Sequence, residues 1–234
     1  MTEAGGTLPD GEVGGRRRLV SLRRREEIIS AAAIKFAEKG YHNVGMREIA
    51  EAMAIRSASL YNHFGSKEEI LYAICLRVTE EPVRQQLPLL DAPGTPAERL
   101  ALLVRGHLEH LAERQVEHLV GLHEMAELTP QHRDVIDAHR RHYQRRVEDV
   151  IAAGARAGEL AVEDISLAAL FMLDALNGFS RWFRPVGPLP VAAVADRYVH
   201  LAIDGLLCRR PFDVGRQPDG LPGPATGFAA VSSE

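Results

Sequence analysis

Arginine side chains cluster near the N-terminus, where their spacing could bring several guanidinium groups against phosphates. They form two runs of three, Arg16 to Arg18 and Arg23 to Arg25. A guanidinium group suits phosphate oxygens and narrow minor grooves because its donors form a planar fork. The alternative is a solvated tail that only keeps the chain soluble. The two runs alone do not decide between these interpretations.

The charge is divided unevenly along the 234 residues. The formal net charge is −4, which taken alone argues against a whole surface that attracts nucleic acid. Residues 16–67 nevertheless hold 11 Lys and Arg against 5 Asp and Glu, a charge of +6. The remaining residues hold 17 against 27, a charge of −10. A basic segment on an acidic body predicts that only this segment approaches a polyanion.

Three helical patterns position the residues of the basic segment. Apolar residues recur at helical spacing over 22–39 and again over 45–53. After a turn at 54–56, a third pattern covers 57–63. This last helix is under two turns long, so it cannot be stable alone. A short helix held by its neighbours is suited to the major groove, which the second helix of a helix-turn-helix enters.

The rest of the chain continues with helical patterns and shows no alternating strand pattern, so the predicted fold class is all-α. Ser66, Thr95 and Thr129 are predicted N-caps, the last two followed by Pro at the first helical position. Pro82 and Pro88 are expected to interrupt the pattern. The expected helices cover 67–78, 95–113, 115–128, 130 to about 154 or 158, 163–183 and 191–207.

The stretch MREIAEAMAIRSASLYNHFGSKEEIL, Met46 to Leu71, resembles the DNA-binding segment of the TetR family of bacterial transcriptional regulators. The matching features are Ile49-Ala50, Leu60-Tyr61, His63-Phe64, Ser66 to Glu69 and, upstream, Ala37 to Tyr41. The resemblance implies a homodimer that binds a palindromic double-stranded DNA operator and is regulated, by family default as a repressor, by a small-molecule effector. Gly45 and Arg56 depart from the family pattern, which usually has Thr or Ser at the first position and often Ser at the second.

The resemblance carries DNA-binding roles to individual residues. The positions that commonly touch phosphates are here Arg47, Tyr61, His63 and Lys67. The exposed positions that read bases in the family are here Arg56, Ser57, Ala58 and Asn62. Asn to adenine and Arg to guanine are the chemically sensible pairings. Arg23 and Arg24 of the arginine runs complete the predicted DNA-binding site. For Tyr61 the alternative is a core aromatic.

The Gly- and Pro-rich composition of both ends, together with the two-domain plan that the resemblance implies, predicts four segments. These are a disordered arm over 1–21, a helix-turn-helix DNA-binding domain over 22–67, a helical effector-binding and dimerisation domain over 68–208, and a disordered tail over 209–234. TetR-like proteins pair their last two long helices across a two-fold axis. The predicted dimer contacts are therefore Leu170, Leu173, Phe179, Val194, Tyr198, Leu201 and Ile203, each with intrachain core packing as its alternative.

An Arg-aromatic-aromatic-Arg-Pro run ends the helix expected over 163–183. It resembles a segment of a TetR subgroup in which some members sense acyl-CoA esters, which makes such an ester a candidate effector. Its alternative is structural, with Arg capping helix carbonyls and Trp packing. The predicted effector pocket consists of His107, His123, Phe171, Arg181 and Trp182.

The competing functions are a helical metal-dependent enzyme and a protein–protein adaptor. His pairs such as His107 and His110 could share a metal, but no HExxH spacing is present, so solvated or pocket-lining His are expected, without metal or cofactor. A nucleophile elbow, a phosphate loop and paired carboxylates are lacking, so the chain is not expected to be an enzyme. The adaptor interpretation leaves the basic segment unexplained. Two Cys, no signal-peptide pattern and no apolar run of spanning length indicate a cytoplasmic protein without membrane contact.

Overall fold

The computed structural model describes residues 10–206, and in this range every regular element is a helix, which confirms the all-α prediction. The head consists of α1 (Asp10–Lys39), α2 (Met46–Ala52) and α3 (Ser57–Tyr61). The body begins with α4 (Lys67–Gln85) and continues through η1 (Leu87–Asp91), α5 (Pro96–Glu113), α6 (Gln115–Glu124), η2 (Met125–Glu127), α7 (Pro130–Ala157), α8 (Ile165–Trp182), α9 (Val191–Val199) and η3 (His200–Leu206).

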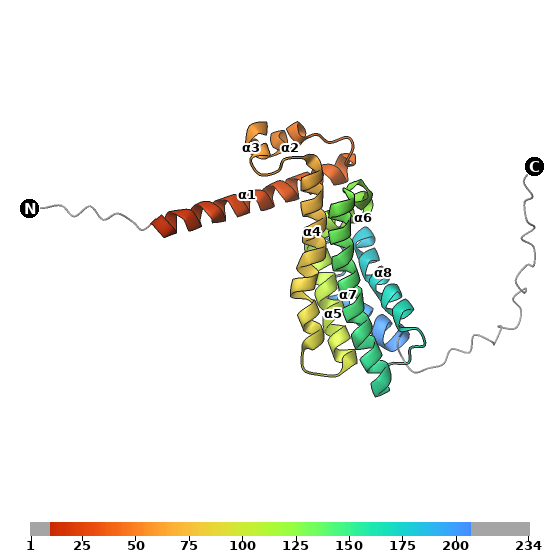
Figure 1. Cartoon of the computed structure of the whole chain (residues 1–234). Coiled ribbons are helices and arrows are strands. Elements are labelled where there is room, and N and C mark those ends of the chain that lie inside the picture. The colour runs from red at the N-terminus through yellow and green to blue at the C-terminus, as the bar shows by residue number, and fades with distance from the viewer. Residues whose placement is uncertain (1–9, 207–234) are drawn as a thin grey trace, which may run out of the picture.

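The head lies at one end of an elongated body (Figure 1). The helices α4, α5, α7 and α8 run along the body, and α7 packs against the other three. The C-terminal half of α1 lies across the end of the body beside α4 and α6, whereas its N-terminal half extends past them. No helix in the described range is long and apolar enough to cross a membrane.

Side-chain caps fix where several helices begin. The Thr95 hydroxyl accepts from the Glu98 amide at 3.3 Å, and the Glu98 carboxylate accepts from the Thr95 amide at 2.8 Å. The Thr129 hydroxyl accepts from the His132 amide, and Ser66 does the same for the amide three residues on. These bonds satisfy amides that have no partner within the helix. The three predicted N-caps are thereby confirmed.

Three element boundaries differ from the sequence-based prediction. α1 begins at Asp10 rather than near residue 22, so part of the predicted arm is helical. α4 continues through Pro82 to Gln85, because Pro82 is buried and tertiary packing outweighs the lost backbone hydrogen bond. The last helix changes to π-helical geometry at His200. Residues 1–9 of the predicted arm and the predicted tail over 209–234 lie outside the described residues.

The core of the head does not stop at the predicted boundary between residues 67 and 68. It includes Phe36, Ile49 and Leu60 of the head and continues along α4 as far as Cys75. Val120 from α6 and Ile136 from α7 belong to the same cluster. A second cluster fills the body between α5, α7, α8 and α9. The head therefore folds against the body and shares a core with it.

Candidate DNA-binding head and effector cavity

The helix-turn-helix is formed by α2, a tight turn and α3. The turn contains Ala54 in the left-handed region at φ 53°, a conformation that an alanine adopts only at a cost. α3 has five residues, and Leu60 and the following Phe64 anchor it with at most 1% of their surface exposed. The Gly45 and Arg56 N-caps make no side-chain capping bond. Tertiary burial, and not local capping, holds α3 in place.

The residues predicted to contact DNA gather on the outer surface of this unit. Arg47, Arg56, Ala58, Tyr61 and Asn62 are exposed, and Ser57 and His63 are half-buried. The Tyr61 side chain has 54% of its surface exposed, which decides against the core-aromatic alternative. α3 thus presents one continuous polar face outward.

Several cations of the basic segment have partners inside the protein. The Arg25 guanidinium lies 3.9 Å from the Phe64 ring centre and donates to the His63 carbonyl oxygen at 2.6 Å. The Lys67 ammonium donates to the Tyr41 carbonyl oxygen at 2.8 Å. Surface pairs link Arg47 to Glu51 and both Arg23 and Arg24 to Glu27. The sequence pattern did not distinguish Arg25, which positions α3, from its exposed neighbours.

A buried cation connects the head to the body. Arg77 of α4, with 5% of its side chain exposed, donates to Ser30 at 3.2 Å and forms an ion pair with Glu26, both on α1. Its Nη1 also lies 3.5 Å from the Glu117 carboxylate on α6. This group therefore joins three helices. Sequence reasoning missed it, because an isolated Arg on a helix carries no sign of its burial.

A second set of contacts joins the head to the α6–α7 junction. The Tyr41 amide donates to the Glu124 carboxylate at 3.3 Å. The Glu68 carboxylate accepts from the Thr129 amide at 2.9 Å and contacts His132 Nδ1 at 2.8 Å. These two bonds hold the pKa of Glu68 below its usual range although burial opposes them. A shift of α6 or α7 would therefore be transmitted to the head.

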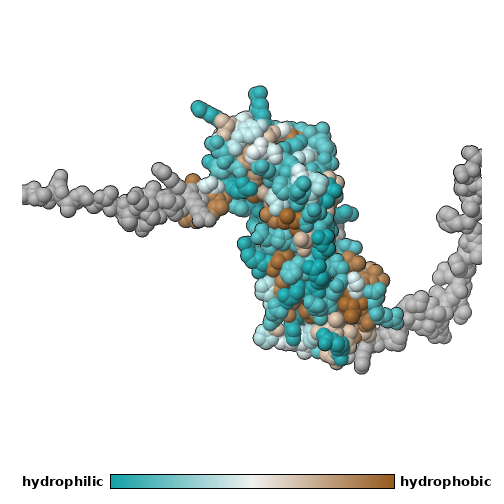
Figure 2. Space-filling model, viewed as in Figure 1, coloured by the Kyte–Doolittle hydropathy of each residue, from teal (hydrophilic) through white to brown (hydrophobic). Residues whose placement is uncertain are grey.

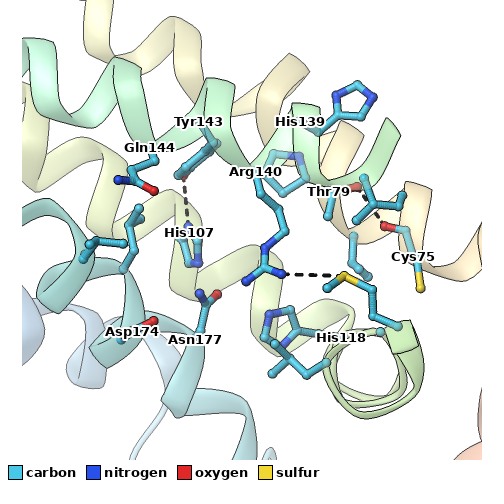
Figure 3. A pocket seen from close by; sticks show the side chains of 18 residues that line it. Cys75, Thr79, His107, His118, His139, Arg140, Tyr143, Gln144, Asp174 and Asn177 are labelled. Atoms are coloured by element: carbon cyan, nitrogen blue, oxygen red, sulfur yellow. Dashed lines mark hydrogen bonds between the residues drawn. The ribbon is translucent and has the colours of Figure 1, made fainter. Parts of the chain in front are cut away.

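The body contains a cavity of about 150 Å³ between α4, α5, α6, α7 and α8. Polar side chains line it from several of these helices, and among them His107, His118, Arg140 and Asn177 lie close together (Figure 3). The rest of the lining includes apolar or weakly polar groups: Cys75, Val78, Pro82, Gly121, Leu122, Met125, Ile136, Leu170 and Leu173. A concave apolar site with a few converging polar groups is typical of a ligand pocket.

Burial sets the protonation states of the side chains that line the cavity. Loss of solvation lowers the pKa of His107 to about 3 and that of His118 to about 4, so both imidazoles are neutral at pH 7. The Tyr143 hydroxyl lies 3.0 Å from His107 Nδ1, and burial raises its pKa. Burial also raises the pKa of the Cys75 thiol to about 12. A thiol that stays protonated is a poor nucleophile.

Of the five residues predicted for the effector pocket, only His107 lines the cavity. His123 is exposed on α6, and Phe171 is 60% exposed because it lies on the outward side of α8. Trp182 packs on Tyr198 and Phe179 outside the cavity, and Arg181 is exposed near it. The lining residues that the prediction missed include His118, Arg140 and Asn177. Helical spacing from His107 would have found none of them, since they lie on other helices.

The predicted dimer residues divide into three groups. Phe179 and Val194 are buried within the chain at 0% and 3% exposure, so they cannot contact a second copy, and the prediction was wrong for them. Leu170 and Leu173 line the cavity, although Leu170 is also exposed. Tyr198 and Ile203 are half-buried, and Leu201 is 68% exposed. The residues of this third group, together with Leu170, therefore remain accessible to a second copy of the chain.

Exposed apolar side chains gather on α8 and on the C-terminal helix, which is formed by α9 and η3. Apolar surface marks the side of the body where these helices lie (Figure 2). The exposed residues there are Leu167, Leu170, Phe171, Trp182 and Leu201. A contiguous apolar face of this kind is typical of a protein–protein interface.

The histidines do not assemble into a metal centre within the described residues. No group of three His, Cys, Asp or Glu side chains there is arranged to hold an ion. His107 and His118 instead face the cavity, with His110 buried nearby.

Two families account for most of the chain. Residues 28–74 match the family described as bacterial regulatory proteins, tetR family. Residues 93–206 match the family described as tetracyclin repressor-like, C-terminal domain. The first match covers most of the head and the start of α4, and the second covers α5, α6, α7 and α8, which enclose the cavity together with α4.

Individual proteins of known name agree with these matches. The chain is 30% identical to the HTH-type transcriptional repressor KstR2 of Mycobacterium tuberculosis over 185 residues, which cover 78% of this chain and 92% of KstR2. The TetR-family regulator PfmR of Thermus thermophilus superposes with a TM-score of 0.72 at 33% identity, covering 76% of this chain and 98% of PfmR. AibR, solved in complex with isovaleryl coenzyme A and operator DNA, superposes with a TM-score of 0.69 at 30% identity, covering 77% of this chain and 98% of AibR.

Proposed function

The chain belongs to the TetR family of bacterial regulatory proteins, and we propose that it is a transcriptional repressor which a small-molecule effector releases from a palindromic operator. The head over 22–67 binds DNA, and the helices over 68–206 bind the effector and a second copy of the chain. One observation carries the DNA-binding part of the proposal. α3 exposes Arg56, Ala58, Tyr61 and Asn62 while buried Leu60 and Phe64 fix its orientation.

An operator-binding experiment tests this function. Fluorescence anisotropy of labelled promoter fragments should show specific binding to a palindrome. Affinity should fall by about 0.9 log unit per log unit of salt for each phosphate neutralised. Binding that is indifferent to salt, or equal for a palindrome and a scrambled sequence, would contradict the proposal.

The effector that we propose is an acyl-CoA ester. Two observations support this choice: AibR was crystallised with isovaleryl coenzyme A, and the lining of the cavity here combines apolar side chains with several polar ones. Addition of acyl-CoA esters of increasing chain length to the protein–operator complex should release the DNA at one range of lengths. Unchanged anisotropy with every ester would remove this effector class.

We propose that the functional unit is a homodimer that pairs through α8 and the C-terminal helix. The exposed residues Leu167, Phe171 and Leu201 support this arrangement, because burying them against a second copy removes apolar area from water. A two-fold dimer also matches the symmetry of a palindromic operator.

The proposed activity is binding and not catalysis, and its place is the cytoplasm, where the chromosome is accessible. The protonated thiol of Cys75 and the neutral imidazoles of His107 and His118 fit a ligand pocket. Acyl-CoA that is recovered intact after prolonged incubation with the protein would agree with this proposal, whereas thioester hydrolysis would contradict it.

A further inference from the structure

The cavity is lined by one guanidinium group, that of Arg140, which forms no ion pair with any of the described residues. Figure 3 shows the Arg140 side chain reaching from α7 toward Asn177 of α8 and His118 of α6. Among the described residues, its one hydrogen bond runs from Nη1 to the Met125 sulfur at 3.6 Å. A thioether is a weak acceptor, whereas a guanidinium group matches two oxygens of an anion. Arg140 is also exposed to solvent, so water solvates its guanidinium group in the free protein, and an anionic ligand in the cavity would replace that water.

Two buried nitrogens beside Arg140 also have no partner. Nε2 of His107 and Nδ1 of His118 are enclosed, with 7% and 6% of the residues exposed, and neither makes a hydrogen bond of normal geometry within the described part of the chain, although the Asn177 amide lies close to both rings. The other ring nitrogen of His107 contacts the Tyr143 hydroxyl. A buried polar atom without a partner is unfavourable, so such groups are usually satisfied by solvent or ligand. Both nitrogens lie on residues that line the cavity.

The apolar part of the lining and the volume restrict what else the ligand contains. Val78, Leu122 and Ile136 offer only apolar surface. A volume of about 150 Å³ equals that of an engineered cavity which takes one benzene molecule, so it suits a hydrocarbon group of about six carbons. A longer chain would have to extend out of the cavity or force the helices apart.

We propose that Arg140 binds an anionic oxygen group of the effector, with hydrogen bonds from His107 and His118, while the apolar wall holds a short hydrocarbon group. The inference rests on the proposed role of this cavity as the effector pocket. The shared chemistry is an anionic oxygen group beside a short acyl chain. It can come from the carboxylate of a free short-chain acid or from a phosphate of its CoA thioester.

The charge of the wall makes Arg140 decisive for an anion. Asp174 on α8 also lines the cavity and contributes a negative charge. Asp174 is exposed, so solvent screens its charge, whereas Arg140 is the only Arg or Lys side chain of residues 10–206 that lines the cavity. With glutamine at position 140, an anionic ligand would meet no guanidinium or ammonium group from this range there. Removal of this one cation should therefore reduce binding by more than the loss of a hydrogen bond.

Calorimetric titration of the full chain with three probes tests the inference: isovalerate, isovaleryl-CoA and isovaleryl-pantetheine. Arg140→Gln is compared with Arg156→Gln, which removes a cation from the exposed far end of the same helix. If the anion is a carboxylate, isovalerate binds and Arg140→Gln weakens it at least tenfold. If it is a CoA phosphate, the CoA ester binds more tightly than the pantetheine ester, and Arg140→Gln weakens the CoA ester alone. In both cases Arg156→Gln binds like the wild type.

Two results would overturn the inference. One is equal affinity of Arg140→Gln and the wild type for every probe that binds, and the other is no binding of any probe to the wild type. Thermal denaturation of both variants verifies that they are folded. Operator binding is measured without ligand. The release of the operator DNA by CoA esters of other acyl-chain lengths is measured separately. The proposed repressor function can therefore survive while this assignment of Arg140 fails.

Discussion

Tyr61 and Lys67 occupy two positions that commonly touch phosphates in the family, but their surroundings differ. Tyr61 projects from α3 with 54% of its surface exposed and makes no hydrogen bond within the described residues. Lys67 lies 4.2 Å from the Tyr41 ring centre and donates to the carbonyl oxygen of the same residue. At the scale of single residues, one side chain is free for DNA and the other also closes the junction between α1, α2 and α4.

Tyr61→Ala should weaken operator binding at least tenfold and leave the melting temperature within about 1 °C of the wild type, as surface substitutions do. Lys67→Ala should weaken binding and also lower the melting temperature, because the Tyr41 carbonyl oxygen keeps only the Val44 amide as a donor in the described range and the Tyr41 ring loses its contact with the ammonium group. Anisotropy titrations and thermal denaturation measure the two effects. Wild-type affinity in both variants would refute the assignment of the DNA-binding face.

The buried imidazoles make stability depend on pH. In the unfolded chain a histidine has a pKa near 6.5, whereas His107 and His118 in the folded chain have pKa values of about 3 and about 4. Between these limits the unfolded state binds more protons, so the free energy of unfolding falls as the pH falls below 6.5. At pH 5 each imidazole lowers the free energy of unfolding by about 2 kcal/mol relative to its value at neutral pH.

Thermal denaturation between pH 8 and pH 5 should therefore show a decrease in melting temperature on acidification. His118→Leu should make this decrease smaller. His123→Leu on the exposed face of the same helix should leave it unchanged. An identical pH dependence in His118→Leu and the wild type would mean that His118 is not held neutral by burial.

At the scale of elements, α4 is the connection between head and cavity. One of its side chains, Arg77, contacts α1 and α6, and others, such as Cys75 and Val78, line the cavity. Glu117, the partner of Arg77 on α6, directly precedes the cavity residue His118. A ligand that moves α6 would therefore act on the position of α1 through this buried ion pair and through the direct hydrogen bond from the Ser30 hydroxyl of α1 to Glu117.

Arg77→Met should lower the free energy of unfolding by about 3–5 kcal/mol, because it leaves the buried Glu117 carboxylate without its cation. The double variant with Glu117→Gln should recover part of this loss. Arg105→Met removes an exposed ion pair with Asp196 and should cost at most about 1 kcal/mol. Urea denaturation measures all three, and equal losses for Arg77→Met and Arg105→Met would contradict a stabilising role for the buried pair.

The sequence was sufficient to predict the elements but not which face of each helix is enclosed. Periodicity and capping residues located most of the helices, and the family resemblance located the residues of α3. Periodicity could not place Phe171 outward and Leu173 against the cavity, because both lie in one continuous apolar stretch. Burial of Pro82 and of Arg77 depends on helices that are distant in sequence, which no local pattern reports.

At the scale of the whole molecule, the basic segment and the proposed dimer face lie on different parts of the protein, although the basic segment also exposes Leu19, Val20 and Leu22. The basic segment is at the head end, and the exposed apolar face lies on the side of the body formed by α8 and the C-terminal helix (Figures 1 and 2). Two copies joined by this face would carry two heads, and each head would present its own α3. The separation of the heads would then depend on how α4 and α1 sit on each body.

Phe171→Asp should convert the dimer into monomers, because it introduces a charge into the apolar face. Sedimentation velocity should then give the mass of one chain, 25.7 kDa, instead of twice that value. Val135→Asp places the same charge at an exposed apolar position of α7, outside this face, and should remain dimeric. A dimeric Phe171→Asp variant would place the interface elsewhere.

The core that joins Phe36 and Leu60 to Val120 and Ile136 has a consequence for protein engineering. A chimaera that keeps the head up to residue 67 and receives another body loses Ile70 and Ile74 of α4, so Phe36 and Leu60 would pack against a surface of different shape. Exchange of operator specificity should therefore succeed when only the exposed residues of α3 are transplanted. Exchange of the whole head would require the matching faces of α4, α6 and α7 to travel with it.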